Sequence, residues 1–391
     1  MPNPTSPDRD RALFSLLNPL PPPPDSTPAA AHAHYASHFR RAAHSLLHHH
    51  HLHLLDRTFS FLEVEFYLRD PSNHHADPFT HGHPNQLRTG TWYFHRVGMS
   101  TGFKGGTRKG LDITTGCAER GATGGILIRA IREVGGGGQV VEGPSLVCDR
   151  ILSEFGVQGL KELVEERWGG NVEIWNRDIG LWVERVNGKD DGDANEMETV
   201  EAVKIETVET PEDGDVSAKV TVSTSTLKRA RADDTSTLTA NDDPPSTFKR
   251  SKTTVTPSVA SAPLPPLYTS PRVGLSLSNN TPTPSLRLQY VHKPYRYMQH
   301  PHLLKKGRQL LALGMLESGE EPRRVVTVTG ASPGAVETWK KELQEGRRKG
   351  KELLKECIGK KVAAEAKLAA KIFGAVKWWE EEEAKGIVVD F

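Results

Sequence analysis

The chain has 391 residues, a formal net charge of +1 and 36% hydrophobic residues. This low hydrophobic content, with 27 prolines and 35 glycines, predicts an unfolded part beside one large domain or a few small ones. Overall charge indicates no partner. The chain has only three cysteines, and their spacing is not that of metal ligands. This fits a protein of a reducing compartment and argues against a framework of disulfide bonds. We expect neither a secretory signal nor a membrane-spanning helix.

The N-terminal segments are of biased composition. Residues 1–30 are rich in proline, which predicts a disordered leader. Residues 31–56 carry many histidines among alanines and leucines. This predicts a helix with a polar histidine face or a low-complexity tract, and a metal site at 44–53 is the less favoured alternative. The leucines that could share one helical stripe are Leu46, Leu47, Leu52, Leu54 and Leu55.

Residues 31–186 are predicted to form the first part of a folded domain. From Phe59 to Arg185, short β-rich runs alternate with glycine-marked turns, which is typical of a mixed, mostly antiparallel sheet. Helices are expected from Pro144 onward and over residues 160–168, and residues 135–138 read as a flexible turn. We therefore expect an α+β fold with helices flanking a single β domain.

The rest of the chain has three segments. Residues 187–266 are acidic and then rich in Ser, Thr and Pro, which predicts a disordered insertion. Basic clusters at 228–231 and 248–252 are either a bipartite nuclear localisation signal or chance basic residues. Residues 267–300 read as closing strands of the domain, and residues 301–391 are helical in composition.

The C-terminal region carries helix boundaries at short spacing. Gly319 ends one helix, Pro322 begins a short second one, and Ser332 caps a third whose first residue is Pro333. This pattern resembles the homeodomain-like helix-turn-helix of transposases and regulators, and Trp339 would be a core residue in it. The alternative is a helical bundle packed on the β domain.

The helix-turn-helix resemblance implies that the third helix enters the major groove of DNA. Lys340 and Lys341 would then lie on or near its DNA-facing surface. The tail at 363–383 reads as a charged amphipathic helix whose role the sequence does not indicate.

The run 62-LEVEFYL-68 places carboxylates in a strand. Alternation puts Glu63, Glu65 and Tyr67 on one face and Leu62, Val64, Phe66 and Leu68 on the other. A carboxylate beside an aromatic ring in a pocket suits a general base that activates water. The alternative is the polar outer face of an edge strand.

A collinear series of motifs follows this strand. It comprises the aromatic strand at 91–95, Gly-Leu-Asp-Ile-Thr at 110–114, Gly-Ile-Leu-Ile-Arg-Ala-Ile at 125–131 and Gly-Pro-Ser-Leu-Val-Cys at 143–148. The series resembles the methylpurine-DNA glycosylase (alkyladenine or 3-methyladenine DNA glycosylase) family, as do the segments at 177–184, 270–274 and 293–297. The resemblance covers about residues 59–298, apart from the insertion.

The resemblance implies roles for individual residues. Glu65 falls on the acid that deprotonates the attacking water, and Tyr67 on the ring that stacks against the extruded base. His81 fits the pocket histidine, with His75 as its rival. Arg129 falls on an arginine that contacts phosphate near the reacting nucleotide.

The chain departs from the family pattern in two places. Asp112 stands where the family has an asparagine that limits which purines enter. The Gly-rich loop 102–110 replaces a Tyr-Gly-Met run, so the groove-intercalating aromatic is unassigned, with Phe103 and Tyr93 as candidates. The loop cations predicted to contact phosphates, unopposed by acids, are Lys104, Arg108 and Lys109.

The expected function is base-excision repair in the nucleus. The enzyme would act as a monomer on double-stranded DNA and hydrolyse the N-glycosidic bond of alkylated or modified purines. Because no lysine stands at a motif position to form a Schiff base, we expect a monofunctional enzyme, and we expect no metal or cofactor. One alternative is a DNA- or chromatin-binding protein on a degenerate glycosylase fold. Another is an N-glycosidase that acts on nucleosides or RNA.

Overall fold

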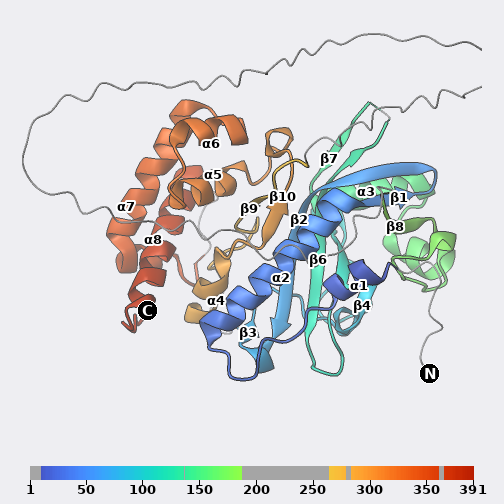
Figure 1. The fold of residues 1–391 in the computed structure, drawn as a ribbon, viewed down its shortest axis with the longest axis horizontal. Helices are drawn as coiled ribbons and strands as arrows, with labels where there is room; N and C mark the ends of the chain where they lie inside the picture. The colour runs from blue at the N-terminus through green and yellow to red at the C-terminus, as the bar shows by residue number, and fades with distance from the viewer. Residues whose placement is uncertain (1–9, 136, 187–263, 279–282, 361–364) are drawn as a thin grey trace, which may run out of the picture. The chain divides into compact units, whose positions relative to one another are not determined.

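The computed structural model describes residues 10–135, 137–186, 264–278, 283–360 and 365–391. A large antiparallel sheet with flanking helices confirms the expected α+β class (Figure 1). Residues 187–263, which include both basic clusters of the expected insertion, lie outside the described residues. None of the helices in the described ranges combines the length and apolar character that a membrane crossing needs.

The sheet is built around two long neighbouring strands, β2 and β6. The main path runs β4-β5-β6-β2-β1-β8, while β10 and β3 pair with β2, β7 pairs with β6, and β9 pairs with β10. All of these pairs are antiparallel. The strands are β1 (His50–Leu54), β2 (Arg57–Asp70), β3 (His75–Ala76), β4 (Thr89–Phe94), β5 (Leu111–Thr115), β6 (Thr123–Glu133), β7 (Val140–Glu142), β8 (Leu181–Arg185), β9 (Tyr268–Ser270) and β10 (Arg296–Met298).

Strand β2 is an interior strand. It has β6 on one side and β1, β10 and β3 at successive places along the other. From Phe59 to Phe66 every residue is buried, on both faces. The alternative of a polar outer face on an edge strand is therefore wrong, and any carboxylate in this stretch is removed from bulk solvent.

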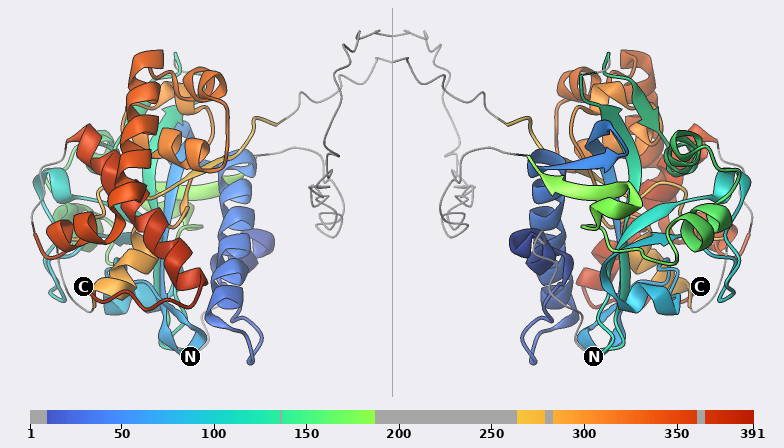
Figure 2. Two further views of the ribbon diagram at one scale, coloured as in Figure 1. Left: turned by 90° about the vertical axis from the view of Figure 1, so that its left-hand side faces the viewer. Right: turned by 90° about the vertical axis from the view of Figure 1, so that its right-hand side faces the viewer.

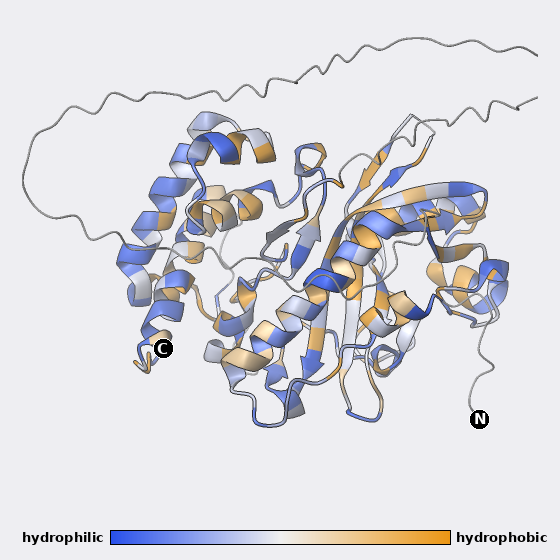
Figure 3. Ribbon diagram, viewed as in Figure 1, coloured by the Kyte–Doolittle hydropathy of each residue, from blue (hydrophilic) through white to orange (hydrophobic). Residues whose placement is uncertain are grey.

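One face of the sheet packs against two N-terminal helices, α1 (Arg11–Leu17) and α2 (Pro28–His49). The ring of Phe39 on α2 stacks on Phe66 of β2 with centroids 4.8 Å apart. Phe66 lies opposite Ile126 of β6, so both strands contribute to this core. Figure 3 shows hydrophobic residues along α2 and β2, as burial of this interface requires.

Residues 10–30 differ from the expected disordered leader. Asp10 caps α1 by accepting from the backbone N–H of Leu13, and the side chains of Leu13 and Leu17 are fully buried. Burial of these leucines outweighs the effect of the prolines that follow them. Residues 1–9 lie outside the described residues.

The histidine-rich tract is divided between two elements. Helix α2 ends at His49, and residues 50–54 form β1. The expected single helical stripe of leucines is therefore wrong. Leu52 and Leu54 alternate with His51 and His53, the period-2 pattern of a strand, and both leucines are fully buried.

A β-bulge in β2 changes which residues share a face. The register against β6 shifts between Phe61 and Glu63 and again between Glu63 and Val64. Leu62 consequently packs in a different cluster from Val64 and Phe66, beside Met298 and Ala130. The expected grouping of Leu62 with Val64, Phe66 and Leu68 is wrong, because one extra residue inverts the alternation on one side of the bulge.

The segments between β6 and β8 follow their sequence signals. Helix α3 (Pro144–Phe155) begins at the expected proline and ends at Gly156, whose φ of +63° is left-handed. The expected helix at 160–168 is present, with a π-helical stretch at Glu162–Arg167. Both pack into the main core through Val147, Cys148, Ile151, Leu163 and Val164.

The chain returns to β2 after residue 263. Strand β9, the short helix α4 (Pro284–Val291) and strand β10 follow one another, and β10 pairs with residues 63–65 of β2. Segments more than 200 residues apart in sequence thus meet at the middle of β2.

Four helices complete the described chain: α5 (Arg308–Glu317), α6 (Pro322–Thr329), α7 (Pro333–Cys357) and α8 (Ala366–Ala384). The expected boundaries are confirmed: Gly330 caps α6, and Ser332 accepts from the N–H of Ala335 at the start of α7. Residues of α5, α6 and α7 pack on Leu62 and Ala130, with Trp339 partly buried among them. Figure 2 shows α2 and these helices on different sides of the strands.

Candidate active site

One row of directly opposed residues crosses the sheet at Glu65. From β9 to β4 the row reads Ser270, Arg296, Glu65, Leu127, Asp112 and Tyr93. Directly opposed residues of antiparallel strands point to the same side of a sheet. We call this side the Glu65 face. Two buried carboxylates, Glu65 and Asp112, therefore lie on one face, two strands apart.

Glu65 is fully buried and holds three hydrogen bonds. Its Oε2 accepts from the Tyr67 hydroxyl (2.8 Å) and from Nη1 of Arg129 (3.3 Å), and its Oε1 accepts from the backbone N–H of Val273 (2.6 Å). We call these four residues the Glu65 cluster. Three donors on one carboxylate suit its ionised, acceptor-only form.

Glu63, two residues earlier, is also buried but is held differently. Its Oε1 accepts from Nε of Arg129 (2.6 Å) and from Nε of Arg296 (2.5 Å). Burial alone would raise the pKa of Glu63, but Arg296 and then Arg129 outweigh it and lower the pKa. Glu63 therefore binds the two arginines, and Arg129 links it to Glu65.

Arg129 differs from its expected role. Its side chain is 7% exposed and its guanidinium contacts both carboxylates. A residue that contacts DNA phosphate would have to be reachable from solvent. Burial would lower the pKa of Arg129, but Glu65 and Glu63 raise it instead, so it stays cationic. The structure gives Arg129 the position of a residue that orients Glu65.

Tyr67 is partly exposed, and one face of its ring is covered. The guanidinium carbon of Arg272 lies 4.5 Å from the ring centroid, in cation–π geometry. Arg272 is fully buried, pairs with Asp77 and donates to the carbonyls of Phe66 (3.1 Å) and Tyr290 (3.2 Å). Burial and then the Glu65 carboxylate raise the pKa of the Tyr67 hydroxyl well above its usual range, so it remains a donor.

A second polar group lies beside the first on the Glu65 face. We call it the Asp112 cluster, and its members are His81, Gln86, Tyr93, His95 and Asp112. Asp112 is 2% exposed and accepts from Nε2 of His95 (3.0 Å) at one oxygen and from the amide of Gln86 (3.2 Å) at the other. Gly125 lies against it: a Cβ there would come within 2.8 Å of Asp112 Oδ2. The glycine therefore allows β5 and β6 to hold Asp112 without a clash.

His81, the expected pocket histidine, lies in the Asp112 cluster. Its Nδ1 contacts the Tyr93 hydroxyl, and its ring lies 6.0 Å from that of His95. Burial, then Lys104 and His95, lower the pKa of His81 to about 4, so the ring is neutral near neutral pH. His75, the rival candidate, is fully buried under α2, where it contacts the Tyr295 hydroxyl (3.1 Å).

The cations of the loop at 102–110 occupy three different environments. Lys104 is half-buried and close enough to Asp112 and His81 for its charge to influence their surroundings. Arg108 is exposed. Lys109 pairs with Asp149 of α3, so the expectation that the loop cations are unopposed by acids is wrong for this residue.

Neither aromatic candidate for intercalation projects from the surface. Tyr93 is 2% exposed, and the Phe103 ring lies under the guanidinium of Arg96 at 3.5 Å. The turn before this loop instead exposes Val97 (56%) and Met99 (65%). Sequence reasoning missed these residues because it sought an aromatic side chain. The signal was an apolar pair beside Gly98 in an otherwise polar loop.

Lys340 and Lys341 lie on α7, away from both clusters. Both side chains are exposed, and most of α7 is hydrophilic in Figure 3. Within the described ranges, no group of three or more His, Cys, Asp or Glu residues is placed to hold a metal ion, the histidine-rich segment 44–53 included.

Other residues of the site were present in the quoted motifs without an assigned role. They are Glu63, Gln86, His95, Arg272 and Val273. An arginine in a Ser-Pro-Arg-Val-Gly segment of strand-like character was a signal of a buried ion pair. Its partner, Asp77, lies about 200 residues away and could not be identified from spacing.

Comparison with known proteins identifies a similar sequence of viral origin. An uncharacterized protein of Acanthamoeba polyphaga mimivirus is 32% identical to this chain over 133 residues, which are 31% of this chain and 58% of the viral protein. The chain thus spans somewhat more than half the length of that relative. No protein-family profile and no solved structure matches the chain.

Proposed function

We propose that this protein is a monofunctional DNA glycosylase that removes alkylated or otherwise modified purines from double-stranded DNA in the nucleus. One observation carries the proposal. The Glu65 carboxylate, buried in an interior strand, accepts hydrogen bonds from three separate segments that the family resemblance had singled out. These donors come from β2, β6 and the Ser-Pro-Arg-Val-Gly segment.

In the proposed mechanism Glu65 takes a proton from a water molecule. The water attacks C1′ of the extruded nucleotide as the bond to the base breaks. Hydrogen bonds from Arg129 and the Val273 amide fix the direction of the carboxylate. Until the proton is transferred, the negative charge of the carboxylate stabilises the oxocarbenium character that develops on the sugar. Because the Glu65 side chain is fully buried, the proposal includes a rearrangement on DNA binding that admits the water.

The base would stack on Tyr67. Arg272 covers one face of this ring, so the base takes the other face. A base alkylated at N3 or N7 carries positive charge, and its stacking on an aromatic ring adds about 0.5–2 kcal/mol. Asp112 places a carboxyl group where the family has an asparagine amide, and its two oxygens already accept from His95 and Gln86.

Extrusion of the nucleotide requires a group to fill the gap in the base stack. Met99 and Val97 are exposed apolar side chains at the tip of a turn, the kind of wedge that proteins insert between base steps. The turn leads through Phe103 and Lys104 toward the Asp112 cluster. We assign the wedge to Met99, the more exposed of the two.

A second function is favoured by a different observation. Lys340 and Lys341 are exposed on the first turns of α7, where a helix-turn-helix protein contacts DNA. A non-catalytic DNA- or chromatin-binding protein would need these lysines and not Glu65.

The substitution Glu65→Gln separates the two functions. It keeps the size of the side chain and its acceptor oxygen but removes the base. We expect release of 7-methylguanine or 3-methyladenine from methylated duplex DNA to fall by roughly 10²–10⁴-fold, while duplex binding persists. Abasic sites scored on oligonucleotides with a single modified purine measure the effect.

The matched control is Glu184→Gln, which removes a half-exposed strand carboxylate on β8. It should release bases at the wild-type rate. Absence of abasic product from the wild-type protein on every modified purine, with duplex binding intact, would favour the binding protein over the enzyme.

A further inference from the structure

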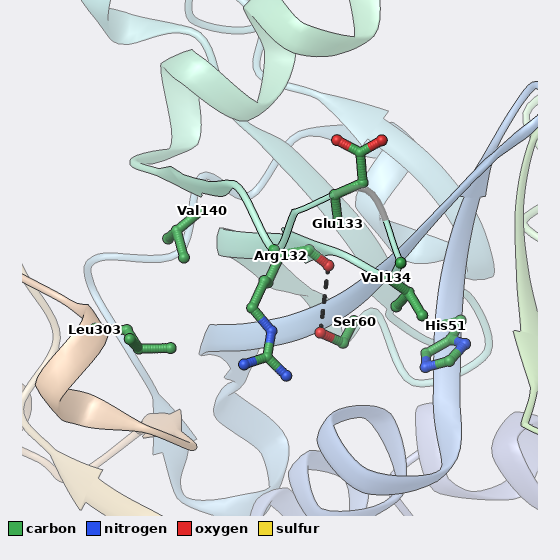
Figure 4. Close-up of a pocket in the computed structure, with 9 residues that line it drawn as sticks. His51, Ser60, Arg132, Glu133, Val134, Val140 and Leu303 are labelled. Atoms are coloured by element: carbon green, nitrogen blue, oxygen red, sulfur yellow. Dashed lines mark hydrogen bonds between the residues drawn. The ribbon is translucent and has the colours of Figure 1, made fainter.

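A surface hollow of about 440 Å³ lies at the far end of β2 from the Glu65 cluster (Figure 4). Its floor is a second row of opposed residues: His51 of β1, Ser60 of β2, Arg132 of β6 and Val140 of β7. Leu303 forms a wall, and Gly135 and Gly138 line the rim. The volume is in the range of small-ligand sites.

Arg132 is a cation without an anionic partner in the hollow. No hydrogen bond or ion pair of its guanidinium occurs within the described part of the chain. The neighbouring carboxylate, Glu133, points away from it in Figure 4 and pairs with Arg57 (2.7 Å) and Arg150 (3.5 Å). The acid beside the hollow is therefore already neutralised, and Arg132 is not.

Polar side chains and imidazoles surround Arg132. In the row of opposed residues Ser60 lies between Arg132 and His51, so the His51 imidazole is on the far side of Ser60 from the guanidinium (Figure 4). The Ser60 hydroxyl donates to the backbone carbonyl of Arg132 (3.3 Å). Burial, then Arg132 and His302, lower the pKa of His300, which places a further imidazole within electrostatic reach. Gly135 and Gly138 have no side chains, so a ligand can approach the backbone at the rim.

We propose that this hollow is an anion site that binds a phosphate group. The Arg132 guanidinium supplies a two-pronged donor for the phosphate oxygens, and an imidazole N–H of His51, at the other end of the same row, supplies a further hydrogen bond. The phosphate is either part of a nucleic-acid backbone or a free phosphate or monoester. The site does not depend on the proposed glycosylase activity, because it shares no residue with the Glu65 or Asp112 cluster.

Calorimetric titration of the full-length protein with inorganic phosphate tests the proposal. We expect saturable binding that Arg132→Gln weakens at least tenfold. The matched control is Arg177→Gln, which removes an exposed arginine already paired with Glu184 (2.8 Å) and should bind phosphate like wild type. Equal affinity of wild type and Arg132→Gln, or no saturable binding by wild type, would overturn the site.

Three further measurements keep the test decisive. Thermal unfolding without phosphate verifies that Arg132→Gln is folded, and Arg132→Lys, which keeps the charge but not the fork, should weaken phosphate binding less than glutamine does. Duplex affinity measured against salt concentration identifies the source. If the site binds a backbone phosphate, Arg132→Gln should lower the slope of log duplex affinity against log salt concentration by about 1. An unchanged slope with abolished phosphate binding identifies a free phosphate or monoester.

Discussion

Glu63 and Glu65 lie two residues apart, yet they have different hydrogen-bond partners and therefore different roles. Both contacts of Glu63 are to guanidinium groups. Arg296, one of the two, also donates to Ser270 (2.9 Å) and to the carbonyls of Gly307 (2.9 Å) and Lys306 (3.0 Å). Removing one member of such a buried network costs about 3–5 kcal/mol. Glu63 therefore ties β2 to the returning chain, whereas Glu65 shares only one of these arginines and is the proposed general base.

Met99 offers a test of the proposed extrusion step. The change Met99→Ala removes the exposed apolar wedge and should slow base release from duplex DNA by about tenfold, because the gap in the stack is then unfilled. Release from a single-stranded oligonucleotide should be unaffected, since no stack needs to be opened. Single-turnover rates on both substrates measure this.

The control for Met99 is Leu146→Ala, which truncates a 47% exposed apolar residue on α3. It should leave both rates unchanged. Equal losses on duplex and single-stranded substrates after Met99→Ala would mean that Met99 affects the site itself and not the extrusion of the base.

Among the elements, β2 decides how the site is built. Its bulge at residues 61–64 directs Leu62 toward the cluster with α5, α6 and α7 while Glu63 keeps its two arginines. A regular strand would place either the leucine or the carboxylate in the wrong environment. The bulge thus places a leucine that packs against α5, α6 and α7 next to a buried ion-pair network, within three residues of the chain. Bulges are over-represented beside active sites.

Helix α7 carries the prediction for the helix-turn-helix. The double change Lys340→Gln and Lys341→Gln should weaken duplex binding to a similar extent for all sequences. It should also lower the slope of log affinity against log salt by about 2, because each of the two lysines would neutralise one phosphate. Filter binding at several salt concentrations measures the slope.

Lys385→Gln, at the end of α8, is the matched control. Its ammonium group is exposed and pairs with Glu382 (2.8 Å), so its removal should leave the slope unchanged. A slope that does not change in the Lys340 and Lys341 double variant would favour the alternative of a helical bundle that does not bind DNA.

Across the whole molecule, elements with local signals were predictable from the sequence. The start of α3 at Pro144, the capping of α7 by Ser332 and the glycine ends of α5 and α6 each depend on a few adjacent residues. Helix α1 was missed because the stabilising contacts of Leu13 and Leu17 are tertiary. The bulge in β2 was missed because it is set by pairing with β6.

The candidate site was predictable only where its residues are close together in the sequence. Glu65 and Tyr67 are two residues apart, so alternation alone brought them together. Arg129 was identified through its motif, but its carboxylate contacts follow from the register of β6 against β2. His81 was expected to be the pocket histidine, and the structure places it beside Tyr93 and near Asp112, because the turn at 77–87 ends beside β4 and β5. These contacts join residues that are far apart in the sequence, and no local pattern indicates which strands pair or in which register.

The histidines make the stability of the whole molecule sensitive to acid. Burial is the largest cause that lowers the pKa of His32, His75 and His292 to about 3, and that of His38, His48 and His81 to about 4. The unfolded chain binds these protons near pH 6.5. Stability is therefore fully present above pH 6.5 and is lost as the pH falls toward 4, by up to about 1.4 kcal/mol per pH unit for each histidine.

His292 allows one of these contributions to be removed. Its ring stacks on Phe373 with centroids 4.6 Å apart, and its Nδ1 has no hydrogen-bond partner among the residues that the structure describes. The change His292→Phe therefore keeps the stacking and removes one titrating group. The free energy of unfolding is measured by urea denaturation between pH 4.5 and 7. It should fall less steeply with acid in the variant, because unfolding then takes up at most one proton fewer than in wild type. A slope identical to wild type would mean that folded His292 binds its proton as readily as the unfolded chain does.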